Sequence, residues 1–161
     1  MRSQVSMHTH GELIGKIRLF DGKNHEFIWS MVPLFSQMKL FKKDILYTQG
    51  DQSQEVFFII KGRVKFFWKK PITGEETRLL RLKNVYIDPP IAFNTHVEGS
   101  YFGDNDVMLD GGRGGRDSTS IAMKNCDLMV IRKKPLEDLL LKFPVYRRQM
   151  KATAVKRKYH H

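Results

Sequence analysis

The strongest constraint on the fold is a series of short apolar segments, separated by turn residues, that begins near residue 38. These segments are rich in β-branched and aromatic side chains, and Gly50-Asp51 and Lys61-Gly62 are typical turn signals between them. Several short strands at regular spacing are typical of a β-sandwich or β-barrel. We expect strands over residues 40–47, 56–60, 64–68, 77–82, 120–123 and 127–131, with a hairpin turn at residues 71–74.

Helical periodicity flanks this β-region at both ends, which makes the fold class α+β. Apolar residues recur at helical spacing in residues 3–20 and 25–37, and Pro33 should kink or end the second helix. On the other side, a helix that starts near Pro135 and a last helix over 145–159 follow the final strand. Residues 85–97 are less regular, and we expect a surface loop there because two prolines interrupt any strand.

The length and composition are those of one domain with a real core, since 41% of the 161 residues are hydrophobic. No apolar run approaches the roughly 20 residues of a membrane span, and the start does not resemble a signal peptide, so we expect a soluble, intracellular chain. The single Cys126 excludes an internal disulfide, and its apolar neighbours favour a small buried residue on a strand.

A formal net charge of +11 favours an anionic partner, which is nucleic acid, an anionic membrane face or an anionic ligand. The cations are densest at residues 132–134 and 147–158. Nucleic acid is not expected as a partner, because no helix-turn-helix follows the last strand and no RNA-recognition stacking motif is visible. The basic final helix is either a solvated face or an element near anionic lipid.

Residues 98–122 have the features of a small anion pocket. Gly103 leads into a short apolar helix, and a glycine-rich loop after that helix delivers Arg116. Backbone N–H groups at a helix start carry the positive end of its dipole, glycines allow a ligand to approach the main chain, and arginine offers a planar fork of donors. A phosphate group is the ligand that this pattern favours.

This segment resembles the phosphate-binding cassette of cyclic-nucleotide-binding domains, here residues 102–122. Phe102-Gly103-Asp104 matches the family's Phe-Gly-Glu, with Asp for Glu, and residues 116–122 match its Arg-x-Ala-Thr/Ser-Val-x-Ala at Arg116, Thr119 and Ala122. Gly50-Asp51 followed by residues 56–62 resembles the signature that precedes the cassette in the same family. The resemblance implies a β-jelly roll with N-terminal helices, two C-terminal helices and a cAMP or cGMP ligand.

The resemblance also implies a role for each site residue. Arg116 would pair with the cyclic phosphate, with Arg113 as a substitute, unless it is only a surface arginine. Asp104 would accept a hydrogen bond from the ribose 2′-hydroxyl, and Thr119 would contact the phosphate or a guanine, unless it is a plain strand residue. Met150 would contact the base from a lid helix, or else simply pack. The expected ligand-binding residues are Phe102, Gly103, Asp104, Val107, Arg116, Ser118, Thr119 and Met150.

Neither an enzyme nor a metal site is expected. The sequence offers no nucleophile, no paired acid and base, and no set of metal ligands. His8 and His10 with Glu12 only faintly resemble the cupin metal motif, because the spacing is wrong and these residues precede the β-region.

Residues 2–14 resemble the end of the linker that joins the pore of cyclic-nucleotide-gated and voltage-gated-like potassium channels to their cytoplasmic domain. The resemblance implies a lead-in over residues 1–20 and a binding domain over 21–161, with residues 145–159 as the lid helix. It further implies the cytoplasmic domain of a membrane protein, tetrameric in the full channel, while the fragment could be monomeric. The alternative, favoured by Asp104, Asp106 and the glycine-rich loop, is the same fold without nucleotide binding, serving as an interaction module.

Overall fold

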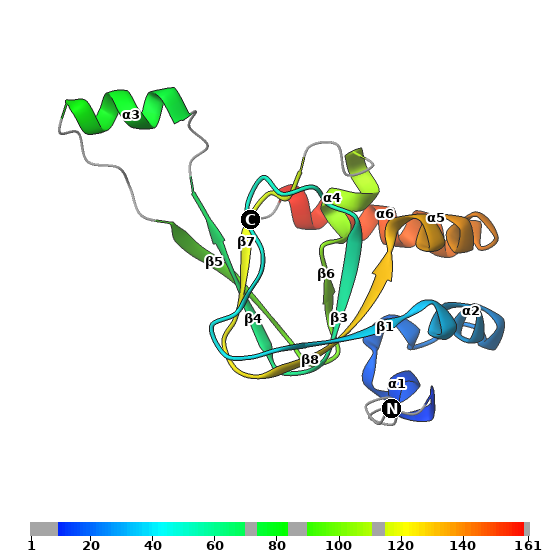
Figure 1. The fold of residues 1–161 in the computed structure, drawn as a ribbon. Helices are drawn as coiled ribbons and strands as arrows, with labels where there is room; N and C mark the ends of the chain where they lie inside the picture. Colours follow the sequence, from blue (N-terminus) through cyan, green and yellow to red (C-terminus); the bar gives the residue numbers. More distant parts are fainter. Residues whose placement is uncertain (1–9, 70–73, 84–89, 111–114, 160–161) are drawn as a thin grey trace.

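Eight antiparallel strands in two four-stranded sheets form the centre of the structure, a computed structural model that describes residues 10–69, 74–83, 90–110 and 115–159 (Figure 1). The first sheet has the order β1, β8, β3 and β6, and the second has the order β2, β7, β4 and β5. The strands are β1 (Ser36–Leu40), β2 (Ile45–Tyr47), β3 (Glu55–Lys61), β4 (Arg63–Trp68), β5 (Ile91–Val97), β6 (Tyr101–Phe102), β7 (Thr119–Ala122) and β8 (Cys126–Arg132). This is the β-jelly roll that the sequence predicts.

The central strands β3 and β8 of the first sheet are buried on both faces, which explains their continuous apolar runs. Side chains alternate along a strand, so Phe57 and Ile59 of β3 point between the two sheets, whereas Val56, Phe58 and Ile60 point to the opposite side. There they meet a layer of helices. A strand covered on both faces has no polar face, and the usual alternation of apolar and polar residues disappears.

The tight turn between β3 and β4 requires glycine. Gly62 has a φ of +116°, and a Cβ atom built on it would lie 2.5 Å from the Cys126 sulfur and 2.9 Å from the Asn125 carbonyl oxygen. The buried thiol of Cys126 therefore fills the space that this glycine leaves.

Helices from both ends of the chain cover the outer face of the first sheet (Figure 1). The N-terminal set is α1 (His10–Lys16), η2 (Arg18–Phe20), α2 (His25–Met31) and η3 (Val32–Leu34), and the later set is α4 (Asp104–Asp110), α5 (Lys133–Leu141) and α6 (Pro144–Tyr159). Leu13 and Ile17 are buried in the same core as the strands, and the domain boundary at residue 20 stays a prediction. Among the described helices, none has the length and hydrophobicity needed to cross a membrane.

The two predicted N-terminal helices end earlier than expected, at Lys16 and Met31. The helix predicted over 3–20 is α1 followed by a separate 3-10 turn, and residues 1–9 lie outside the described residues. The helix predicted over 25–37 is α2 followed by η3, because Pro33 stops the α-helical hydrogen bonding. Strand β1 then begins at Ser36.

The strand predicted over 77–82 is wrong, because this segment is part of helix α3 (Gly74–Leu82). Glu, Arg and Leu dominate α3, and all three are strong helix formers, whereas the segment has almost no β-branched residues. The loop predicted over 85–97 is also wrong in its second half, where β5 pairs with β4 from Ile91 onward. The predicted turn at 71–74 and the first part of that loop fall largely outside the described residues.

Candidate functional site

A cavity of about 20 Å³ lies between the second sheet and the start of α4. This is roughly the space of one water molecule, whereas ligand clefts usually measure about 300–1,000 Å³. Aromatic side chains form one wall, and polar groups of the cassette and of α6 form the other. Its lining residues are Tyr47, Phe66, Phe93, Asn94, His96, Phe102, Gly103, Asp104, Asn105, Asp117, Ser118 and Arg157.

Gly103 makes the close turn from β6 into α4. Its φ is +86°, and an added Cβ would lie 2.9 Å from Nη1 of Arg116 and 3.2 Å from the carbonyl oxygen of Glu55. Glycine is therefore needed here for two reasons, the left-handed backbone and the close approach of a guanidinium.

Arg116 is buried and holds the cassette to β3. Its Nη1 donates to the Gly103 carbonyl at 3.0 Å, and its Nη2 donates to the Glu55 carbonyl at 2.7 Å. The guanidinium lies 4.3 Å from the centre of the Tyr47 ring and 5.6 Å from that of Phe57. Arg116 thus stands behind the cavity wall, clamped by carbonyls and aromatic rings.

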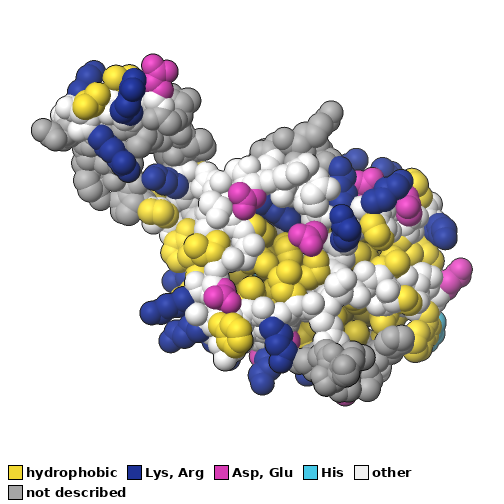
Figure 2. All heavy atoms as spheres, viewed as in Figure 1, with side chains coloured by type: hydrophobic (Ala, Val, Ile, Leu, Met, Phe, Trp, Pro, Cys, Tyr) yellow, Lys and Arg dark blue, Asp and Glu magenta, His cyan; other side chains and the backbone are white. Residues whose placement is uncertain are grey.

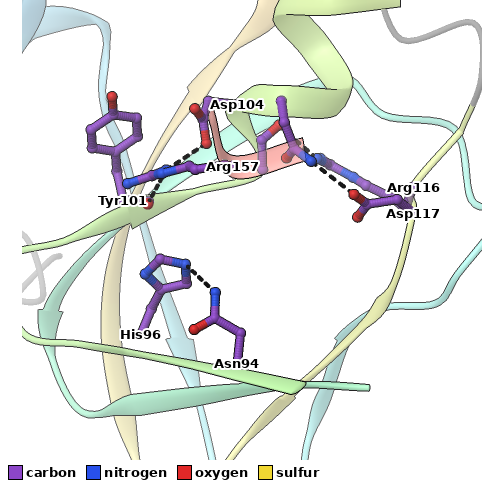
Figure 3. A network of polar contacts seen from close by, with 9 residues as sticks. Asn94, His96, Tyr101, Asp104, Arg116, Asp117 and Arg157 are labelled. Carbon is purple, nitrogen blue, oxygen red and sulfur yellow. Dashed lines mark hydrogen bonds and ion pairs between the residues drawn. The ribbon is translucent and has the colours of Figure 1, made fainter. Parts of the chain in front are cut away.

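An ion pair between Asp104 and Arg157 joins the start of α4 to the last turns of α6 (Figure 3). Nη1 of Arg157 lies 2.6 Å from Oδ1 of Asp104 and also donates to the Tyr101 carbonyl at 2.7 Å. The Asp104 side chain is 1% exposed and that of Arg157 is 24% exposed. The guanidinium of Arg157 therefore pairs with the carboxylate that a ligand in the cavity would otherwise contact.

Burial raises the pKa of the Asp104 carboxyl, and the charge and hydrogen bond of Arg157 oppose that rise. Its second oxygen, Oδ2, has no hydrogen-bond partner among the described residues. A buried carboxylate oxygen in this state is costly, so Asp104 depends strongly on Arg157.

Tyr101 is the aromatic partner of this pair, since the Arg157 guanidinium lies 4.3 Å from its ring centre. Burial first, and then the charge of Asp104, raise the pKa of Tyr101 from 10.0 to about 12. The folded protein keeps the phenol proton at a pH where the unfolded chain has lost it.

We expect Tyr101 to make the stability fall between pH 10 and 12. Its contribution is fully present below the unfolded pKa of 10.0 and is lost as the pH rises through the folded value of about 12. The loss is on the order of 3 kcal/mol. Urea unfolding across this range checks it, with Tyr101→Phe as the control because lysines titrate there too. An equal slope in Tyr101→Phe would assign the effect to other groups.

Two polar side chains of β5 face the cavity from the opposite side (Figure 3). Asn94 and His96 lie on the same face of the strand, with Nδ2 of Asn94 3.5 Å from Nε2 of His96. The His96 ring stacks on Phe102 at 5.9 Å and meets Phe66 edge-on at 5.3 Å. This wall offers hydrogen-bonding groups within a flat aromatic surface, which suits a planar heterocycle.

Four of the eight predicted site residues line the cavity, namely Phe102, Gly103, Asp104 and Ser118. Arg116 touches its back wall through Gly103. Thr119 is turned aside, since its hydroxyl accepts a hydrogen bond from the Gln49 backbone at 2.9 Å. Val107 and Met150 are buried in the core beneath the helices, so Met150 packs between elements in this structure.

Some predicted groups cannot be placed. The loop with Arg113 and the side chain of Asp106 lie outside the described residues, as do His8 and the terminal histidine pair. Within the residues that the structure describes, no group of three or more potential metal ligands gathers.

Arg157 is the main residue that the sequence interpretation missed. It stands at i+7 from Met150 and i+3 from Ala154, so it continues the apolar stripe of α6 toward the cassette. That spacing is the signal that could have identified it.

Comparison by sequence finds a family model that matches this chain, and comparison by shape finds the same fold in solved structures. Residues 37–143 match the model of the family described as cyclic nucleotide-binding domain. The human protein named cyclic nucleotide-gated channel beta-1 is 22% identical over 144 residues, which cover 89% of this chain and 10% of that protein. The chain thus spans about a tenth of that relative.

Two solved structures share the fold at low sequence identity. The regulatory domain of Toxoplasma gondii PKA, solved with cAMP, has a TM-score of 0.71 and 14% identity, covering 91% of this chain and 48% of that one. The catabolite activator protein of Thermus thermophilus has a TM-score of 0.67 and 18% identity, covering 89% of this chain and 58% of that one.

Proposed function

The chain belongs to the cyclic nucleotide-binding domain family, and we propose that it binds cAMP or cGMP in the cavity beside the cassette as a regulatory, non-catalytic domain. The observation that carries this proposal is the match of residues 37–143 to the family model, and Arg157 links the cavity to the final helix, because it lies inside the cavity on Asp104. A ligand that enters there must meet α6. Occupancy of the site can therefore change the position of that helix.

The expected residue roles fit this geometry once the cavity widens. Gly103, Phe102 and Ser118 line the space, and Asp104 would accept the ribose hydroxyl after Arg157 moves. Arg116 would meet the phosphate from the back wall. Thr119, Val107 and Met150 would act only after a rearrangement of α4 and α6, which pack against each other.

Displacement of Arg157 has a thermodynamic consequence for affinity. The closed state, with Arg157 on Asp104, competes with the ligand, and only the open fraction binds. Each ~1.4 kcal/mol by which the pair favours closure lowers the apparent affinity about tenfold.

For the parent protein we propose a cation channel. The supporting observations are the similarity to a protein named as a channel subunit and the resemblance of the lead-in to a channel linker. In that setting the chain is a cytoplasmic domain of a membrane protein, the channel is a homotetramer, and α6 transmits the ligand signal to the pore.

A second candidate function is an interaction module with a closed pocket. Three observations favour it, namely the small cavity, the Asp104–Arg157 pair and the two carbonyls that already hold Arg116. In this case Arg157 of α6 fills the pocket in place of a nucleotide, and the domain responds to the binding of a protein partner.

Calorimetric titration separates the two functions. The wild-type chain and Arg157→Gln are each titrated with cAMP and with cGMP up to millimolar concentration. Saturable heat supports the regulatory function, and tighter binding by Arg157→Gln supports competition for Asp104. An absence of heat in both proteins, with both folded by circular dichroism, would establish the closed module instead.

A further inference from the structure

Helix α3 stands at the far end of the β4–β5 ribbon, away from the rest of the molecule (Figure 1). The two strands pair antiparallel up to Trp68 and Ile91, so a tight turn could join them at that point. The chain instead inserts residues 69–90 and builds a helix there. Among the side chains of α3 that the structure describes, none belongs to either core cluster. An insertion with its own secondary structure and no role in the core indicates a surface function.

The side chains of α3 form an apolar ridge with cations beside it. Leu79 and Leu82 lie three residues apart on one face and are 44% and 73% exposed. Arg78 and Arg81, each one residue before a leucine, form a second exposed pair beside this face. The exposed Lys83 follows Leu82. The exposed carboxylate of Glu75 lies in the first turn, where the helix dipole favours it, three residues before Arg78 on the same face of the helix.

The end of the ribbon continues the same mixture of side chains. Trp68 and Ile91 face each other in register and are 40% and 57% exposed, and the exposed Lys69 follows Trp68. Figure 2 shows hydrophobic and Lys or Arg side chains together on the projecting lobe that α3 forms. The helix and the end of the ribbon thus each combine exposed apolar side chains with cations.

We propose that α3 and the adjoining end of the β4–β5 ribbon dock on the surface of an anionic lipid bilayer. A bilayer surface offers negative charge to Arg78 and Arg81, and an apolar layer just beneath it to Leu79 and Leu82. A nucleic acid would use the cations but leave the leucines in water. A second copy of this chain would bring its own net charge of +11 against the same cations. The inference does not depend on cyclic nucleotide binding.

Vesicle co-sedimentation of the whole chain tests the proposal. We expect binding to phosphatidylcholine vesicles that contain phosphatidylserine, weaker binding at high salt and little binding to pure phosphatidylcholine. Arg78→Gln/Arg81→Gln and Leu79→Ser/Leu82→Ser should each lose roughly tenfold or more in affinity. The matched control is Arg148→Gln/Lys151→Gln, which removes two exposed charges from α6 and should bind like the wild type.

Tryptophan fluorescence adds a local readout, since the chain has only Trp29 and Trp68. In a Trp29→Phe background, anionic vesicles should shift the Trp68 emission to the blue. All substituted side chains of α3 are exposed, so unchanged melting curves confirm that the variants are folded. Absent binding to anionic vesicles, or equal loss in the α6 control, overturns the proposal. Duplex DNA binding that needs the arginines but not the leucines would also overturn it.

Discussion

Replacing Arg157 with glutamine should lower the free energy of unfolding by about 3–5 kcal/mol, the typical cost of removing one partner of a buried ion pair. The reason is Asp104, which would keep a buried charge after losing its 2.6 Å contact. Its Oδ2 has no hydrogen-bond partner among the described residues, so only the backbone N–H groups of Asp104 and Asn105 remain to stabilise the carboxylate. Urea unfolding at neutral pH measures the change.

Three further variants show whether the loss comes from the pair itself. Lys156→Gln removes a neighbouring exposed cation of α6 and should change stability by less than about 0.5 kcal/mol. Asp104→Asn/Arg157→Gln removes both charges, so it should recover part of the loss, with a coupling energy of about 1–3 kcal/mol. Arg157→Lys keeps the charge and should lose less than Arg157→Gln.

Asp104→Asn alone completes the cycle, and additive effects of Asp104→Asn and Arg157→Gln would contradict this account, because independent sites show no coupling. Hydrogen exchange gives a second check on the same variants. If Arg157 fastens α6 to the cassette, the amides of α6 should exchange faster in Arg157→Gln but not in Lys156→Gln. Equal exchange in both would mean that apolar packing alone positions α6.

The central strands were predictable because their signal is local. Residues 56–60 and 128–131 are buried on both faces of their sheet, and such burial leaves a continuous run of apolar residues that few other structures require. Helix α3 gave no such signal. Its exposed surface carries no burial pattern, so only the propensities of Glu, Arg and Leu indicated a helix, and the nearby turn residues favoured a hairpin.

The cassette was predictable for a similar reason, since Phe102, Gly103 and Arg116 follow each other within one short stretch of sequence. Arg157 is 53 residues away from Asp104, and their contact exists only because α6 packs on α4. Local sequence does not encode the angle at which one helix crosses another. The sequence shows that α6 has a narrow apolar stripe, and the structure shows that Arg157 ends this stripe inside the cavity.

The position of Arg116 illustrates the same limit. Its place in the sequence indicated an anion-binding group, but the carbonyls of Gly103 and Glu55 that surround it come from two different elements. An arginine that holds a fold together and an arginine that binds phosphate have the same local sequence. Only the three-dimensional surroundings separate them.

Replacing Arg116 with alanine should destabilise the protein by about 3–5 kcal/mol. Two carbonyl oxygens lose their donors, at about 1–3 kcal/mol each, and the stacking on Tyr47 and Phe57 disappears, at about 0.5–2 kcal/mol. Urea unfolding checks the value. The matched control is Arg63→Ala on the exposed start of β4, which should stay within about 0.5 kcal/mol of the wild type.

Arg116→Lys separates the structural role from the phosphate role. Lysine keeps the positive charge, but its single ammonium does not reproduce the planar fork that reaches both carbonyls. If Arg116 is a structural clamp, Arg116→Lys should be nearly as unstable as Arg116→Ala. If the positive charge itself binds a phosphate, Arg116→Lys should retain a larger fraction of the wild-type nucleotide affinity than of the wild-type stability. A stable Arg116→Ala protein would contradict the clamp, because the guanidinium would then hold nothing that the fold needs.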